Sequence, residues 1–340
     1  MIALQITGLE TIQTIELPDP APLQPTEVLL KIEYVGFCGS DLNTFLGRNG
    51  MAKANVIPGH EVSAVVEAVG TEVPSTIQPG MRVTVNPYTN CGHCASCRNG
   101  RVNACEHNQT LGVQRDGAMR QFMTLPWQKV IHAPRLLPET IALIEPMSVG
   151  FHAVSRAQVT DIDNVMVIGC GMVGLGAIVR AAQRGATVIA ADIDDDKLEL
   201  AQRMGASFTI NTRQEDVHQR LQELTAGLGP DVIVEAVGSV PTYQMAVEEV
   251  AFTGRIACIG YAKQDATLPT RLFVQKELDI RGSRNATPND FLAVIRYLQR
   301  DTCPTSQLIS RIVLPQESQS ALQYWSQNPG KVFRMLVKLS

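Results

Sequence analysis

Four cysteines stand close together in one short stretch of the sequence, with the spacing C-x2-C-x2-C-x7-C. Four thiolates within one loop can close a tetrahedral zinc site that leaves no position open for chemistry, so we predict a structural zinc ion. Two disulfides are one alternative, and an iron–sulfur cluster is the other, although the bacterial cluster motif continues as C-x3-C-P. The four residues are Cys91, Cys94, Cys97 and Cys105.

Two shorter motifs precede the cysteine loop, CGSD at residues 38–41 and GHE at residues 59–61. They contain a thiol, an imidazole and carboxylates, which are the ligand types found in catalytic zinc sites. Neither motif is specific alone, because buried cysteine and core histidine are common in proteins.

A glycine-rich motif, GCGMVG, follows a predicted strand at residues 165–168 and opens a predicted helix at residues 172–184. In this context the glycines permit a tight turn and close approach of a dinucleotide pyrophosphate, which the helix N-terminus attracts. Asp192 ends the next predicted strand, where a carboxylate binds the ribose hydroxyls and repels a 2′-phosphate, so we predict NAD. A turn without bound nucleotide is the alternative. The residues assigned to the motif are Gly169, Gly171, Val173 and Gly174.

The elements that must position these residues divide the chain in two. Short strand-like runs separated by proline and glycine fill residues 1–90, whereas strands and helices alternate from residue 164 onward. Alternation of this kind predicts an α/β protein with a doubly wound parallel sheet. We place the catalytic domain at residues 1–150 and 285–340 and the NAD-binding Rossmann domain at residues 151–284.

Composition narrows the class of protein. The chain has 340 residues and a formal net charge of -4, without a long run of charge of one sign. This argues against binding to nucleic acid or to anionic membranes, and the longest apolar run is too short for a membrane span. The N-terminal residues show no export signal, so we expect a cytoplasmic protein whose cysteines are reduced.

The order of these motifs along the whole chain resembles the zinc-containing medium-chain alcohol dehydrogenase family. The stretch ALIEP at residues 142–146, followed by His152, is similar to the polyol and sugar-acid branch, which includes sorbitol, L-threonine, and L-galactonate or L-idonate 5-dehydrogenases. The resemblance implies a GroES-like, mainly β catalytic domain with an inserted Rossmann domain, two zinc ions per chain and a homodimer or homotetramer.

The resemblance also implies roles for individual residues. It makes Cys38 and His60 ligands of a catalytic zinc ion, with Glu61 and Glu145 completing or exchanging in the coordination sphere, and it leaves open which glutamate binds directly. Ser40 matches a proton-relay hydroxyl, and an N-cap of the following helix is its other possible role. We further assign to the cofactor Lys197, Ile259 and Gly260.

The expected reaction is oxidation of a secondary alcohol in a small polyol or sugar acid, such as a hexonate, to a ketone. Arg284 stands in a stretch similar to sugar-acid enzymes, where it can bind a substrate carboxylate in bidentate fashion. An exposed arginine or a cofactor contact is the alternative for Arg284. A threonine-type amino-alcohol dehydrogenase and a non-catalytic NAD-binding regulator are the alternatives for the whole chain.

Overall fold

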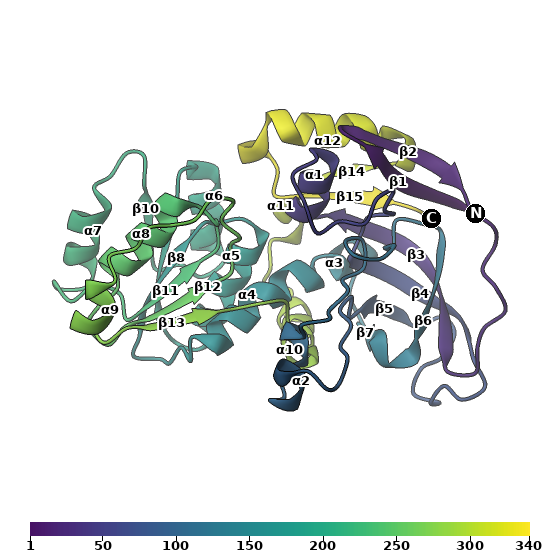
Figure 1. Cartoon of the computed structure of the whole chain (residues 1–340), viewed down its shortest axis with the longest axis horizontal. Helices are drawn as coiled ribbons and strands as arrows, with labels where there is room; N and C mark the ends of the chain where they lie inside the picture. The colour runs from purple at the N-terminus through teal and green to yellow at the C-terminus, as the bar shows by residue number, and fades with distance from the viewer. The chain divides into compact units, whose positions relative to one another are not determined.

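The computed structural model describes all residues from 1 to 340, and it divides into two compact units. The first unit contains Met1–Glu145 and Ile295–Ser340, and the second contains Pro146–Val294. The chain therefore leaves the first unit once and returns to it for its last residues (Figure 1). The functional domain limits that we placed at residues 150 and 285 stay a prediction.

The first unit is built on a mainly antiparallel seven-stranded sheet and a separate hairpin. The strand order of the sheet is β14-β15-β3-β4-β5-β7, and β6 pairs with β3. The hairpin consists of β1 (Ile2–Gly8) and β2 (Thr11–Glu16). The sheet strands are β3 (Glu27–Phe37), β4 (Glu61–Val69), β5 (Arg82–Val85), β6 (Phe122–Pro126), β7 (Val130–His132), β14 (Ile309–Val313) and β15 (Arg334–Lys338).

The long central strand β3 explains how this sheet encloses a core. In its first half, Val28, Leu30 and Ile32 are fully buried and alternate with more exposed residues, as expected for a strand with one face on the core. From Val35 to Phe37 every residue is buried. The end of β3 is thus covered on both sides, and Cys38, which is partly exposed, follows it directly.

Short helices complete the first unit, and the division of the chain into two units falls within two further helices. None of the helices has the length and apolar character needed to span a membrane. The helices of the first unit are α1 (Gly39–Phe45), α2 (Ala95–Arg98), α3 (Pro138–Ile141), α11 (Thr305–Leu308) and α12 (Ser318–Gln327), with 3-10 turns at Val102–Ala104, Trp127–Lys129, Pro315–Glu317 and Pro329–Lys331. The two helices that contain these boundaries are α4 (Ile144–Arg156) and α10 (Pro288–Leu298).

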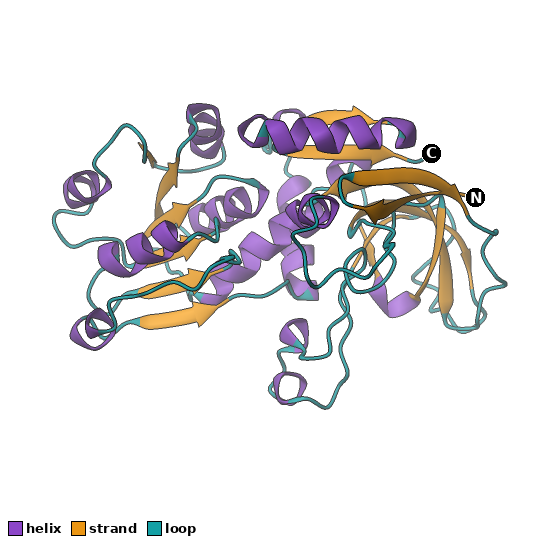
Figure 2. Cartoon of the chain, turned by 45° about the horizontal axis from the view of Figure 1, so that its top comes forward, coloured by secondary structure: helices purple, strands orange, loops and turns teal.

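The second unit contains a six-stranded parallel sheet with helices packed around it (Figure 2). Its order is β10-β9-β8-β11-β12-β13, so the first strand, β8, lies centrally. The next two strands are added on one side of β8 and the last three on the other, which is the doubly wound order. The predicted α/β fold class is therefore confirmed. The strands are β8 (Asn164–Ile168), β9 (Thr187–Asp192), β10 (Phe208–Asn211), β11 (Val232–Glu235), β12 (Arg255–Cys258) and β13 (Asp279–Gly282). The helices are α5 (Met172–Gln183), α6 (Asp195–Arg203), α7 (Val217–Leu224), α8 (Val240–Glu249) and α9 (Arg271–Gln275).

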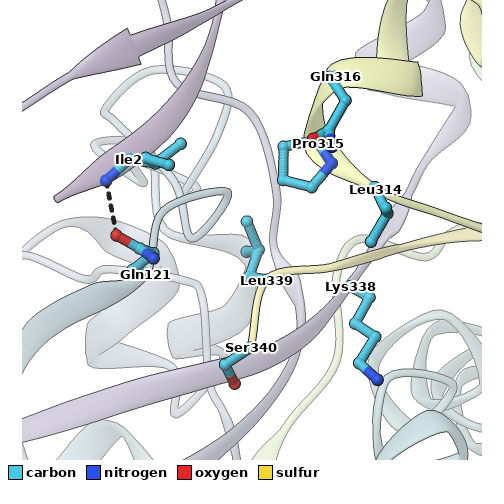
Figure 3. A pocket seen from close by; sticks show the side chains of 8 residues that line it. All are labelled: Ile2, Gln121, Leu314, Pro315, Gln316, Lys338, Leu339 and Ser340. Carbon is cyan, nitrogen blue, oxygen red and sulfur yellow. Dashed lines mark hydrogen bonds between the residues drawn. The ribbon is translucent and has the colours of Figure 1, made fainter.

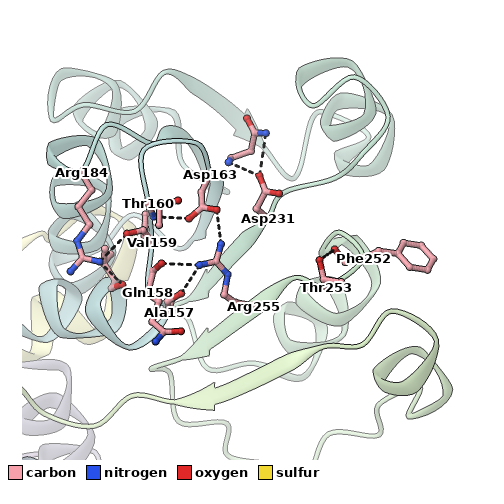
Figure 4. Close-up of polar contacts among 12 residues, drawn as sticks. Ala157, Gln158, Val159, Thr160, Asp163, Arg184, Asp231, Phe252, Thr253 and Arg255 are labelled. Atoms are coloured by element: carbon pink, nitrogen blue, oxygen red, sulfur yellow. Dashed lines mark hydrogen bonds and ion pairs between the residues drawn. The ribbon is translucent and has the colours of Figure 1, made fainter.

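Arg255 at the start of β12 fixes the turn between α4 and β8 (Figure 4). Its guanidinium donates to the carbonyl oxygens of Ala157 and Gln158 at 3.1 and 2.8 Å, and it pairs with Asp163 at 2.5 Å. Carbonyl groups at a helix end lack partners within the helix, and this side chain satisfies two of them while it binds Asp163, the residue before β8.

Helices α4 and α5 approach closely because glycine lies on both sides of their contact. A Cβ atom at Gly150 would overlap the backbone of Val173 and Ala177, and one at Gly176 would overlap the backbone of Met147. Backbone atoms cannot rotate away as a side chain can. The start of α5, which carries the glycine-rich motif, is therefore held by packing that only glycine allows.

Replacing Gly150 with alanine is expected to lower the free energy of unfolding by about 1–3 kcal/mol, because the added methyl group overpacks this contact. Urea denaturation followed by circular dichroism measures the loss. Gly282→Ala is the matched control, since a Cβ there meets no atom within 4 Å. Equal stability of the two variants would show that the helices separate without cost.

Candidate active site and metal centres

A group of three ligand-type residues, two of them buried and one partly exposed, lies where β3 ends and β4 begins. The strands are antiparallel, and Gly36 stands opposite Glu61, so Cys38 after β3 lies beside His60 and Glu61. The Sγ atom, one ring nitrogen and one carboxylate oxygen of the three residues lie within 4.8 Å of one another. The structure thus brings together three of the four residues predicted for the catalytic metal.

Three polar atoms of this group form no hydrogen bond with the protein. His60 Nδ1 and both carboxylate oxygens of Glu61 are buried without a hydrogen bond, and the Glu61 side chain has 0% exposure. A buried polar group left without a partner costs about 1–3 kcal/mol, so such a cluster is unfavourable unless it binds something. Thiolate, imidazole and carboxylate together suit zinc, and three protein ligands leave a fourth position open for substrate. These residues fit a catalytic zinc ion.

The electrostatic field of the group favours a positive charge. Burial alone would lower the pKa of His60, but Cys38, Asp41 and Glu145 raise it well above its usual value. Burial acts to raise the pKa of the Cys38 thiol, yet His60 outweighs this effect and lowers the pKa to about 7. Each shift comes from the opposite charge beside it: anionic neighbours stabilise the His60 imidazolium, and this imidazolium in turn stabilises the Cys38 thiolate.

Glu61 is held in place from the far end of the chain. Arg334 Nε lies 3.2 Å from Glu61 Oε2, and Arg334 Nη1 donates to the carbonyl oxygen of Phe37 at 2.7 Å. The contact with Glu61 is an ion pair without an aligned hydrogen bond, so both carboxylate oxygens keep their capacity to bind a cation. Gly36 makes room for this carboxylate, because a Cβ there would overlap Glu61 Oε2.

Glu145 lies near the same group but has a different partner. It is the second residue of α4, it is 4% exposed, and its Oε1 accepts a hydrogen bond from the Tyr88 hydroxyl. Glu145 also raises the pKa of Glu61, although burial is the larger cause.

Sequence reasoning missed Tyr88 and Arg334. Tyr88 stands three residues before the cysteine loop, and this position between a strand and a metal loop is the only local signal for it.

Ser40 occupies the first turn of α1, where its hydroxyl oxygen is buried and lacks a hydrogen bond to the protein. The suggestion that Ser40 is an N-cap is wrong, because the N-cap of α1 is Cys38. The side chain of Asp41 closes this turn by accepting a hydrogen bond from the Cys38 backbone at 2.8 Å. Ser40 therefore has no capping bond to give up when its hydroxyl binds another molecule.

The four-cysteine loop forms a second metal-ligand cluster in the first unit. The four Sγ atoms lie within 4.8 Å of one another, and none of these cysteines is joined in a disulfide. Backbone N–H groups of Cys91 and Cys94 each donate to a cluster sulfur at 3.3 Å, to Cys105 Sγ and Cys91 Sγ respectively. Backbone hydrogen bonds, chiefly from Cys97, lower the pKa of the Cys94 thiol to about 6. Thiolates arranged in this way fit the predicted structural zinc ion.

The glycine-rich motif in the second unit has the geometry expected of a dinucleotide site. It follows β8, and Gly171 is the N-cap of α5. Gly169 has φ of 95°, a conformation that favours glycine, and a Cβ at Gly174 would overlap the Gly169 carbonyl oxygen. Val173 lies in the first turn of α5. No side chain caps this turn, so its backbone N–H groups are available for an anion.

Asp192 ends β9 directly beside the end of β8, as the parallel pairing requires. Its Oδ2 accepts a hydrogen bond from the Cys170 backbone at 2.7 Å, and its Oδ1 accepts one from the Ile193 backbone at 2.7 Å. The loop and the carboxylate are therefore bound to each other. This contact fixes the acid at the edge of the site where a ribose would lie.

The remaining predicted cofactor and substrate residues lie at the same edge of the sheet or just beyond it. Lys197 is in the first turn of α6, and Ile259 and Gly260 follow β12. Gly260 packs so closely against Gly238 that a Cβ would overlap its backbone. Arg284 is half-buried two residues after β13, and its role stays a prediction.

One pocket in the first unit lies away from all of these residues (Figure 3). Its lining comes from the two chain ends, from Gln121 just before β6 and from the segment before α12, and it includes no predicted site residue. We therefore do not assign it to catalysis. Its lining residues are Ile2, Gln121, Leu314, Pro315, Gln316, Lys338, Leu339 and Ser340.

Comparison with known protein families gives two matches. Residues 24–135 match the alcohol dehydrogenase GroES-like domain, and residues 173–300 match the zinc-binding dehydrogenase family. The first range includes the four-cysteine loop and the group of Cys38, His60 and Glu61, and it ends before Glu145. The second range begins within the glycine-rich motif.

Several curated proteins are similar over most of their length. A zinc-type alcohol dehydrogenase-like protein of Haemophilus influenzae is 33% identical over 94% of this chain and 93% of its own. Sorbitol dehydrogenase of Bacillus subtilis is 33% identical over 96% of this chain and 93% of its own. L-galactonate-5-dehydrogenase of Escherichia coli is 31% identical over 83% of this chain and 82% of its own.

Two solved structures are similar throughout and differ in their coenzyme. An alcohol dehydrogenase of Escherichia coli CFT073 in complex with NADH has a TM-score of 0.91 and 28% identity, over 100% of this chain and 99% of its own. A zinc-binding dehydrogenase of Sinorhizobium meliloti 1021 bound to NADP has a TM-score of 0.90 and 26% sequence identity, and the match covers 99% of this chain and 98% of that one. Likeness alone therefore does not select the coenzyme of this chain.

The geometry predicts unequal effects of the two glutamates on zinc content. Glu61→Gln is expected to weaken zinc binding at the three-residue group by about 10- to 100-fold, because a neutral amide replaces a carboxylate ligand. Glu145→Gln is expected to retain zinc, since Glu145 is held by Tyr88. Zinc analysis after dialysis against a weak chelator measures both, with circular dichroism to confirm folding. Loss of zinc from Glu145→Gln alone would assign the ligand role to Glu145.

Proposed function

The chain belongs to the zinc-type medium-chain alcohol dehydrogenase family, and from this premise we propose that it oxidises a secondary alcohol of a polyol or sugar acid to a ketone with NAD. The observation that carries the proposal is the close group of Cys38, His60 and Glu61, in which His60 Nδ1 and both Glu61 carboxylate oxygens are buried without a hydrogen bond. A group of this kind in a dehydrogenase has an open position for a substrate hydroxyl.

We propose that Cys38, His60 and Glu61 hold the catalytic zinc and that Cys91, Cys94, Cys97 and Cys105 hold the structural zinc. When bound at the catalytic group, zinc supplies Lewis acidity that lowers the pKa of the substrate hydroxyl. Ser40 can accept the hydroxyl proton and pass it on, because its buried oxygen has no competing hydrogen bond. The Tyr88 hydroxyl holds Glu145 beside the group, where this acid shapes the field around the reacting oxygen.

Asp192 supports NAD as the coenzyme. A carboxylate at the end of β9 accepts hydrogen bonds from both ribose hydroxyls and repels the 2′-phosphate of NADP. The backbone N–H groups of Cys170 and Ile193 orient this carboxylate before any nucleotide binds. The residues that follow, Asp194 and Asp195, add no positive charge that would attract a phosphate.

Asp192→Ala is expected to lower the ratio of kcat/KM for NAD to that for NADP by about 10- to 100-fold, the size of lost hydrogen bonds to a charged group. Initial rates with each coenzyme measure the ratio. Asp196→Ala removes the same charge from an exposed position nearby and is the control. Wild-type turnover that is as efficient with NADP as with NAD would overturn the assignment.

Arg284 supports a substrate with a carboxylate. A guanidinium binds a carboxylate through two parallel hydrogen bonds, which can fix one end of a sugar acid and leave a distant hydroxyl for the metal. The similarity to sorbitol and L-galactonate dehydrogenases supports a polyhydroxylated substrate and is compatible with a charged or a neutral one. We therefore propose an aldonate, with Arg284 as the residue that recognises its charge.

Arg284→Lys keeps the charge but loses the paired geometry, so it should lower kcat/KM for an aldonate by about tenfold and leave a neutral polyol nearly unaffected. A screen of polyols, aldonates and amino alcohols, followed by NADH absorbance, identifies the substrate pair to use. Arg271→Lys, an exposed arginine of α9, is the control. Equal losses for the aldonate and the polyol would remove the carboxylate role and leave the dehydrogenase reaction in place.

A further inference from the structure

A third group of ligand-type residues lies on the surface beside the four-cysteine loop. Ligand atoms of Cys91, His93 and His107 lie within 4.8 Å of one another, and both histidines are exposed. The two imidazole rings are tilted by 32°, with centroids 6.0 Å apart. We propose that these residues form a second metal site on the loop, which binds one additional, exchangeable Zn²⁺ ion and shares the sulfur of Cys91 with the structural zinc.

A hydrogen bond prepares His93 for this role. Its Nδ1 lies 2.9 Å from the carbonyl oxygen of Cys91, and a carbonyl oxygen can only accept, so Nδ1 carries the proton. The neutral ring then has its lone pair on Nε2. Histidines that bind metals in proteins commonly donate their other ring N–H to a backbone carbonyl in this way, which fixes the tautomer and the ring orientation.

The Cys91 sulfur has the electron pairs that a shared site requires. A thiolate has three lone pairs, of which the structural zinc takes one and the Cys94 N–H, at 3.3 Å, takes a second. One pair remains for another cation. The net charge of the cluster also favours binding of a second cation. Four thiolates and one Zn²⁺ ion sum to −4 + 2 = −2, and a second dication neutralises this charge.

The donor set selects the kind of metal. Two imidazoles and a thiolate suit zinc and other late divalent transition metals, whereas calcium and magnesium prefer oxygen ligands. Three protein ligands leave one position for water on the exposed side. A sulfur that already binds one zinc donates less strongly to another, and exposed side chains lose conformational freedom on binding. The additional ion is therefore bound more weakly than the four-thiolate zinc.

The proposal rests on the four-cysteine loop holding its own zinc, and the experiment checks this premise first. Untagged enzyme dialysed against a weak chelator should retain two zinc ions per chain. Titration of this holoenzyme with Zn²⁺ in a calorimeter should then show one further ion. His93→Gln and His107→Gln should each raise the Kd for this ion at least about tenfold, since each removes a ligand. His132→Gln, an exposed histidine on β7, should leave the Kd unchanged.

Cobalt distinguishes a shared sulfur from a pair of histidines alone. Co²⁺ added to the zinc-loaded enzyme should give a sulfur-to-cobalt charge-transfer band that His107→Gln abolishes. The proposal would be overturned if the enzyme retains two zinc ions after dialysis but binds no further Zn²⁺ in the calorimeter. It would also be overturned if both histidine variants bind the further ion as tightly as the wild type. Binding without the charge-transfer band would overturn the shared sulfur. Fewer than two zinc ions after dialysis would instead refute the premise that the loop and the catalytic group are both filled.

Discussion

The buried contact of Arg334 with Glu61 and Phe37 is the interaction on which the candidate active site depends. One guanidinium joins the first residue of β4 to the last residue of β3, and these are the strand ends that carry the metal-ligand residues. Removing one partner of a buried ion pair typically costs about 3–5 kcal/mol, because the other charge stays buried. The C-terminal strand β15 therefore supports the candidate active site, although it contributes no ligand-type residue to it.

The two main metal clusters illustrate two ways of assembling ligands. The four cysteines come from one loop of the chain, so the metal itself can organise that loop with little help from the rest of the fold. Cys38 follows β3 and His60 precedes β4, and only the antiparallel register of these two strands brings them together. The first arrangement is closed and suits a structural ion. The second has unsatisfied polar atoms that the sheet holds in place, and it suits chemistry.

This difference explains what the sequence could and could not predict. The cysteine spacing and the glycine-rich motif are local patterns, and both led to the right elements. Tyr88 and Arg334 could not be found in this way, because each acts on a residue distant in the chain: Tyr88 on Glu145, 57 positions away, and Arg334 on Phe37, 297 positions away. Ser40 was a candidate N-cap by residue type alone, but the extended backbone at Cys38 places the cap two residues earlier.

The ends of strands carry the candidate site residues in both units for a common physical reason. Within a strand, paired neighbours on both sides fix the backbone and cover the side chains. At the end of β3, and likewise at the ends of β8 and β9, the backbone is still fixed by pairing, but the next residues turn away and expose their polar groups. Cys38, Gly169 and Asp192 all stand at such positions. Each is rigid enough to hold its geometry and open enough to bind a ligand, which links the placement of both sites to the sheets that support them.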